Sequence, residues 1–266
     1  MDTTSMHAVL AGILVGASLG LTGGGGSIFA VPLLLYALNV PVGTAMGLSL
    51  ATVGLTAGFG AILGMTRSGI EWRAGIIFSL AGMIFAPLGT VIARHIPPVV
   101  LLSTFALLMA FTGWRMWRSS GNRGSEKPSR CVARSRGDFG PECYVRLGLG
   151  GTLAGVLSGL FGVGGGFIIV PVLLFVTGTS IQRAVTTSLL IIFLIAVSGV
   201  SAHVLHGQLF PQPLSILFIG GGFTGMIFGA WLRSRISAPA MKKVFATGMW
   251  LVALWMLWKS FPPTVH

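Results

Sequence analysis

The sequence predicts an all-α polytopic membrane protein built from two inverted-topology repeats. Three observations predict it: the mean hydropathy is +0.89, only 8% of the residues are charged, and the first half recurs in the second half. Water-soluble domains carry about 25% charged residues, so most of this surface is suited to lipid. A closed β-barrel is disfavoured because barrel strands alternate apolar and polar residues, whereas the apolar runs here are continuous.

Apolar runs long enough to cross a bilayer, roughly 17–25 residues each, occur from end to end. They predict spanning helices at residues 43–66, 74–93, 98–117, 184–206, 213–232 and 240–258. Two further apolar segments, 7–38 and 147–177, are interrupted by glycines and are too long for one span. The chain therefore divides into an N-terminal transmembrane repeat (1–117), a basic loop (118–144) and a C-terminal transmembrane repeat (145–266).

The repeat emerges when 139 is added to a residue number in the first half. In this register Gly23 corresponds to Gly162. Ser49 likewise corresponds to Ser188. The register holds for about sixty residues, and one inserted residue then changes the offset to 140. Each repeat is predicted to hold one glycine-broken segment and three spanning helices.

Loop charge predicts how the two copies are oriented. If each glycine-broken segment crosses once, the 17 lysines and arginines divide 11 to 6 between the two sides. If each segment enters and returns, as a re-entrant pair or as two short helices, they divide 15 to 2, which the positive-inside rule favours. Each half then crosses an odd number of times, so the copies are inverted. We expect a multi-pass protein of a bacterial-type inner membrane, with both termini outside and loop 118–144 cytoplasmic.

The net charge of +12 does not indicate a nucleic-acid partner. Eight of the basic residues lie between positions 115 and 146, which is typical of a cytoplasmic loop that fixes orientation, although such a loop can also bind anionic lipid. Cys131 and Cys143 lie in the same segment. Their spacing fits neither a zinc site nor a disulfide framework, so we expect free thiols.

Two stretches, GGGGSIFAVPLL (23–34) and GVGGGFIIVPVL (162–173), predict breaks at membrane depth. Consecutive glycines unwind a helix at a cost of up to about 1 kcal/mol per residue, and non-helical backbone survives in a membrane only inside protein or beside water. New half-helices are expected to start near Ser27 and near Gly166. Their first amides are unpaired and carry the positive end of the helix dipole, and without a Cβ an anion can approach them closely.

Inversion is expected to bring the two half-helix starts face to face near the bilayer midplane, where they can hold one small oxyanion. Close helix packing is the alternative use of glycine, and it fits the spacing of Gly12, Gly16 and Gly20 better than it fits consecutive glycines. Hydroxyls of the following helices can add donors, although serine and threonine also bond back to their own helix. The predicted anion-binding residues are Gly23, Gly24, Gly25, Gly26, Ser27, Ser49, Gly162, Gly164, Gly165, Gly166, Phe167, Thr187 and Ser188.

Pro32 and Pro171 are predicted structural or coupling residues. Each lacks the N–H that would pair with the carbonyl four residues earlier. One possibility is that those carbonyls bind a coupling cation or water, and the other is that the prolines only kink the helix. The coupling partner can be a proton or a cation. No Asp or Glu lies deep in a span, and no His, Cys or Asp cluster suits a metal. We therefore predict no metal site, no cofactor and no enzyme activity.

The paired glycine motifs, each followed by AMGLSL (45–50) or AVTTSL (184–189), resemble the sulfite exporter TauE/SafE family of membrane permeases. The resemblance covers nearly the whole chain outside loop 118–144. The chain departs from the family element at Leu48, where that element has Thr, and at Thr186, where it has Gly. The family's glycine motifs fall on Gly23–Gly26 with Pro32 and on Gly162–Gly166 with Pro171.

The resemblance implies transport of sulfur-containing anions such as sulfite, thiosulfate, sulfoacetate or related organosulfonates. A dianion suits two facing positive helix ends, so the residues and the resemblance agree on the sign of the substrate. The expected function is a secondary transporter, acting as an exporter by alternating access around the two breaks. An anion channel is one alternative. A non-transporting membrane scaffold with a basic docking loop is the other.

Overall fold

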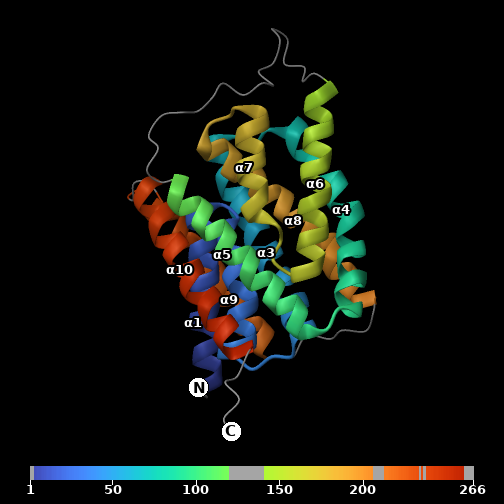
Figure 1. Ribbon diagram of the computed structural model, residues 1–266. Coiled ribbons are helices and arrows are strands. Elements are labelled where there is room, and N and C mark those ends of the chain that lie inside the picture. The colour runs from blue at the N-terminus through green and yellow to red at the C-terminus, as the bar shows by residue number, and fades with distance from the viewer. Residues whose placement is uncertain (1–2, 120–140, 206–212, 234, 236–237, 261–266) are drawn as a thin grey trace.

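The computed structural model describes residues 3–119, 141–205, 213–233, 235 and 238–260, and these form a bundle of helices joined by short connections (Figure 1). A helix lies at each of the six positions where a span was expected, and each helix begins and ends within three residues of the expected bounds. They are α3 (Val42–Ser68), α4 (Trp72–His95), α5 (Pro98–Ser119), α8 (Ile181–Leu205), α9 (Leu214–Arg233) and α10 (Ala238–Ser260).

Helices α1 (Thr3–Thr22) and α6 (Pro141–Phe161) open the two halves. Six of the described helices are long and apolar enough to cross a membrane: α1, α3, α4, α6, α8 and α9. Helices α5 and α10 contribute shorter apolar segments, Pro98–Trp114 and Ala246–Met256. The expectation of an all-helical, multi-pass membrane protein is thereby confirmed.

Each glycine break separates a full-length helix from a short one. The break near Ser27 is followed by one continuous run of helix that starts two residues earlier than expected, as η1 (Gly25–Phe29), α2 (Ala30–Pro32) and η2 (Leu33–Ala37). The second break is followed by α7 (Gly166–Thr177), which starts at the expected residue. With 12 residues, α7 is about 18 Å long and cannot cross a core of about 30 Å. It returns beside α6, in the opposite direction (Figure 1).

The first helix of each half packs on a helix of the other half. A Cβ on Gly16 of α1 would lie 2.0 Å from the carbonyl oxygen of Gly222 in α9, and one on Gly155 of α6 would lie 2.3 Å from that of Gly82 in α4. The two contacts correspond in the repeat register. Only glycine fits so close an approach of two backbones, so the packing role expected for the glycines of α1 is confirmed.

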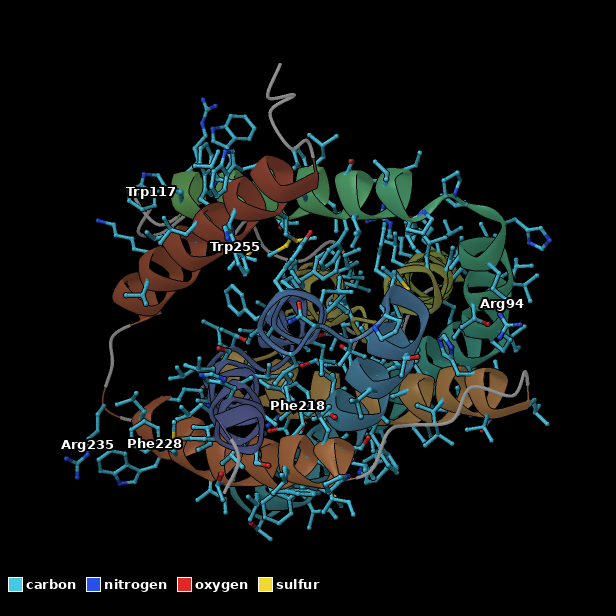
Figure 2. All side chains as sticks on the ribbon, turned by 90° about the horizontal axis from the view of Figure 1, so that it is seen from below. Arg94, Trp117, Phe218, Phe228, Arg235 and Trp255 are labelled. Atoms are coloured by element: carbon cyan, nitrogen blue, oxygen red, sulfur yellow. The ribbon has the colours of Figure 1, made fainter. Side chains whose placement is uncertain are left out.

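The two ends of the bundle contain different helix ends. The start of α1 and the end of α10 lie at one end, whereas α5 ends and α6 begins at the opposite end (Figure 1). Seen from below, α5 and α10 cross over one side of the bundle, Phe218 lies in the interior, and Arg94 and Arg235 project outward (Figure 2). The long apolar helices therefore carry their charges at their ends.

The basic loop predicted at 118–144 lies mostly outside the described residues. One expectation about it is wrong: Cys143, at the start of α6, is disulfide-bonded and is not a free thiol. The spacing argument excluded a zinc site and a framework of several bridges, but a single disulfide needs neither. The partner of Cys143 lies outside the described residues.

Candidate functional site

Both glycine breaks begin with the same helix ending. Gly23 and Gly162 have φ angles of 72° and 69°, in the left-handed region that favours glycine. The Gly23 N–H donates to the Leu19 carbonyl at 2.7 Å, and the Gly162 N–H donates to the Ser158 carbonyl at 2.8 Å. This bond, from the first left-handed residue to the carbonyl four residues earlier, is the αL helix ending. The two breaks therefore share the same backbone geometry at their first residue.

Each break is pressed against a spanning helix of the other half. A Cβ on Gly23 would lie 2.3 Å from Val185 Cγ1 in α8, and one on Gly162 would lie 2.6 Å from Met46 Cα in α3. Met46 and Val185 correspond in the repeat register. Residues 23–28 and 162–166 are all buried. The two breaks therefore occupy corresponding, buried positions.

The two breaks also touch each other. A Cβ on Gly24 would lie 2.8 Å from the Cα of Gly166, and one on Gly166 would lie 2.5 Å from the Cα of Gly24. Such distances leave no room for any side chain between the two backbones. The structure thus brings together the predicted residues of both glycine motifs, which lie about 140 positions apart in the chain.

Ser49 and Ser188 lie at the breaks, each at the break of the opposite half. The Ser49 hydroxyl donates to the Gly162 carbonyl at 2.7 Å. The Ser188 hydroxyl donates to the Gly23 carbonyl, and it also lies 2.8 Å from the Val185 carbonyl of its own helix. Both side chains are fully buried. A hydroxyl has one proton, and in both serines that proton is used on carbonyl oxygen.

Thr187 is placed differently from its neighbour Ser188. Its hydroxyl donates to the Arg183 carbonyl at 2.8 Å and accepts the N–H of Glu71 at 3.0 Å. Glu71 immediately precedes α4, and its carboxylate lies 3.0 Å from the Arg183 guanidinium. The Thr187 hydroxyl therefore ties the start of α4 to the first turns of α8, and it makes no hydrogen bond to a break.

The first break has two hydroxyls of its own, and sequence reasoning missed the role of one. Thr22 Oγ1 accepts the Gly26 N–H at 3.0 Å, and the Ser27 hydroxyl donates to the Gly24 carbonyl at 2.7 Å. The position of Thr22, directly before four glycines, was the available signal, because a hydroxyl there can reach the amides after a turn. The equivalent positions of the second break are Phe161 and Gly166, which have no hydroxyl.

Several main-chain amides at the breaks are left as donors. Among the described residues, no hydrogen bond uses the N–H of Gly24, Gly25, Gly164 or Gly165. The amides of residues 166 and 167 open α7, and the first amides of a helix have no acceptor within it. These N–H groups and the helix dipole make the start of each short helix electropositive, which suits an anion.

The two prolines differ in their surroundings. Pro32 is buried, within the continuous run of helix that follows the first break. Pro171 is exposed, inside α7. The π-helical turn η2 begins directly after Pro32, as is common where a helical hydrogen bond is missing. The prolines therefore match in sequence but not in environment.

Comparison with known proteins agrees with these features. The family described as "Sulfite exporter TauE/SafE" matches residues 8–256. A "Probable membrane transporter protein" of Xylella fastidiosa (strain Temecula1) is 35% identical to the chain, over 96% of this chain and 95% of its own length. YdhB of Bacillus subtilis, described in the same words, is 27% identical over 87% of this chain and 95% of its own. No solved structure matches the chain.

Proposed function

Because the chain belongs to the sulfite exporter TauE/SafE family of membrane transporters, which are not enzymes, we propose that it is a secondary transporter that exports small sulfur-containing anions. Sulfite, thiosulfate and organosulfonates are the substrates this proposal names. The observation that carries it is the contact between two buried glycine breaks, each followed by a helix start. A pair of helix N-termini inside a membrane is a site for a negative solute.

The positive potential at this site comes from the main chain. Among the described residues, the buried polar side chains include no lysine and no arginine. An anion that enters the site therefore has amide donors and helix dipoles to replace its hydration shell. Such donors hold an anion without the desolvation cost of a buried cation, and they leave it free to depart, as a transported solute must.

Of the predicted amide donors at Gly24–Ser27 and Gly164–Phe167, those of Gly26 and Ser27 already donate hydrogen bonds within the first break. We therefore assign anion binding to the amides of Gly24 and Gly25 and to those of Gly164–Phe167. The hydroxyl protons of Ser49, Thr187 and Ser188 are already donated to carbonyl oxygens, so direct contact between these hydroxyls and the anion would require those bonds to break. Amides without an acceptor carry no such cost. The amides are therefore the stronger candidates for the first contacts with substrate.

We further propose that the halves are inverted repeats that work by alternating access. The corresponding contacts of Gly16 with Gly222 and of Gly155 with Gly82 support this, as do the opposite directions of α1 and α6 (Figure 1). Broken helices that meet between inverted repeats are the usual architecture of secondary transporters. The contact between Gly24 and Gly166 lies where such a transporter would alternate its access.

The proposed orientation places both termini outside and the basic segment in the cytoplasm. Arg118 lies in the last turn of α5, Arg146 lies near the start of α6, and Arg94 lies in the last turn of α4. Helix α5 ends and α6 begins at one end of the bundle, whereas α4 ends at the other (Figure 1). The Arg118 guanidinium stacks 5.5 Å from the Trp114 ring centroid, and that of Arg235 lies 4.3 Å from the Trp231 centroid. Tryptophan and arginine together are typical of a membrane–water interface.

Thiol labelling tests the orientation. In a chain with both natural cysteines replaced by serine, we expect an impermeant maleimide on intact cells to label Ser5→Cys and not Trp117→Cys. The disulfide of Cys143 is the one observation that favours the opposite orientation, because thiols are kept reduced in the cytoplasm. Labelling of Trp117→Cys from outside would contradict the orientation.

Flux measurements test the function. In proteoliposomes, we expect sulfite or thiosulfate to be driven uphill by an ion gradient and the flux to saturate with concentration. Gly165→Val should abolish the flux while the protein still inserts, because Gly165 has a φ of 64° and its Cβ would lie 2.7 Å from the Ala154 carbonyl oxygen. Gly26→Val is the matching change in the first break, because Gly26 corresponds to Gly165 in the repeat register and its Cβ would lie 2.2 Å from the Leu19 nitrogen. Flux that stays linear and never runs uphill would identify a channel, and flux unchanged in both variants would remove the breaks from transport.

A further inference from the structure

The left-handed turn of each break leaves one buried carbonyl outside the helical hydrogen-bond pattern. Gly23 and Gly162 follow the last residues of α1 and α6, so their carbonyl oxygens point away from the helix that their N–H groups close. A buried backbone carbonyl without a donor costs about as much as a lost hydrogen bond. Each of these oxygens therefore needs a donor from elsewhere in the protein.

In both breaks that donor is a serine of the other half. The Ser49 hydroxyl of α3 donates to the Gly162 carbonyl, and the Ser188 hydroxyl of α8 donates to the Gly23 carbonyl. The two pairs exchange under the repeat register, because 49 and 23 become 188 and 162. The hydrogen bonds are therefore reciprocal, since each half supplies the donor for the break of the other.

The same helix face supplies packing as well as the donor. Met46 lies three residues before Ser49 and packs against Gly162, and Val185 lies three residues before Ser188 and packs against Gly23. Residues three apart share a helix face. Each break is therefore held at two points by one face of a single opposing helix.

We propose that Ser49 and Ser188 are positioning residues that form a reciprocal latch between the two halves. Each hydroxyl fixes the peptide plane at the first residue of the opposite break and so sets the direction of the amides that follow. A break can then change shape only when the other half releases it, which couples the two halves during transport. This role in transport rests on the proposed function, but the latch itself does not.

Within the part of the chain that the structure describes, most other hydroxyls form hydrogen bonds of a different kind. Thr56, Thr152 and Thr177, for example, bond back to carbonyls of their own helices, which is the ordinary use of threonine in a membrane helix. Ser198 provides a matched control, because its hydroxyl also crosses between halves, from α8 to the Met83 carbonyl at 2.7 Å. That carbonyl lacks a helical donor because of Pro87, four residues later in α4, and it does not belong to a glycine break.

Hydrogen exchange tests the latch without any transported solute. In detergent or in nanodiscs, we expect Ser49→Ala to raise amide exchange in residues 162–169 and to leave residues 23–29 unchanged. Ser188→Ala should do the reverse, and Ser198→Ala should raise neither. If an alanine variant does not fold, the cysteine variant at the same position keeps the volume but donates weakly, and it should show a smaller shift at the same remote break. No change at the opposite break in a folded variant would overturn the latch.

Transport then separates a latch from a substrate ligand. We expect Ser49→Ala and Ser188→Ala each to lower the maximal rate for sulfite about tenfold, equivalent to about 1.4 kcal/mol, with KM unchanged. The loss should be equal for thiosulfate, Ser→Thr at either position should restore part of the rate, and Ser198→Ala should keep it. A rise in KM for one anion only would make the serine a ligand and overturn its positioning role. If the wild type moves no sulfur anion while remote exchange still changes, the latch stands and the proposed function fails.

Discussion

The first glycine break supplies more of its own hydrogen bonds than the second. In the first break, the Thr22 hydroxyl accepts the Gly26 N–H and the Ser27 hydroxyl donates to the Gly24 carbonyl. The equivalent positions of the second break are Phe161 and Gly166, which have no hydroxyl. Both breaks receive one serine bond from the opposite half. The difference therefore lies in local capping, and it leaves the second break with more of its donors uncommitted.

The helices that follow the breaks differ in the same direction. The first short helix opens with a 3-10 turn, η1, whereas α7 is α-helical from its first residue. An α-helical start aligns its free amides along one axis, and the dipole is concentrated at that turn. We infer that the second break carries the larger share of anion binding and that the first break is the more rigid of the two.

The largest expected effect comes from separating the breaks. A Cβ on Gly166 would meet the backbone of Gly24 at 2.5 Å, and a contact with backbone cannot be relieved by a rotamer change. We expect Gly166→Ala to abolish sulfite flux and the rise in melting temperature that bound sulfite should give. Gly148→Ala is the control, because nothing lies within 4 Å of its Cβ position. Full flux in Gly166→Ala would show that the contact between the breaks has no role.

A smaller effect tests the local capping of the first break. Thr22→Val removes the acceptor of the Gly26 N–H at nearly constant volume, and a hydrogen bond of this kind is worth about 1 kcal/mol. We expect the free energy of unfolding to fall by about that amount and the KM for sulfite to stay within twofold of wild type. Denaturant unfolding and flux assays measure the two quantities. A large rise in KM would mean that the first break binds the anion as strongly as the second.

Much of this site could be predicted from the sequence, because its signals are local or repeated. Runs of glycine mark the breaks, apolar length marks the spans, and a constant offset pairs Ser49 with Ser188. The offset could not reveal that each serine serves the opposite half, since that depends on how α3 and α8 pack. Nor could it reveal that Pro171 is exposed while Pro32 is buried, because exposure is set by neighbouring helices and not by the motif.

The smallest expected effect concerns the residue that precedes each latch serine. Ser188 is preceded by Thr187, whose hydroxyl accepts the Glu71 N–H and donates to the Arg183 carbonyl. Ser49 is preceded by Leu48, whose side chain has no polar group. The Arg183 side chain is 48% exposed, and partly exposed ion pairs are worth about 0–1 kcal/mol. We therefore expect Glu71→Gln to change stability by less than about 1 kcal/mol, while Thr187→Val, which leaves the Glu71 N–H without its acceptor, should raise hydrogen exchange at the start of α4 and at residues 23–29. If exchange rises at the start of α4 alone, the latch of the first break is independent of this cluster, and the two latches are equivalent despite their different surroundings.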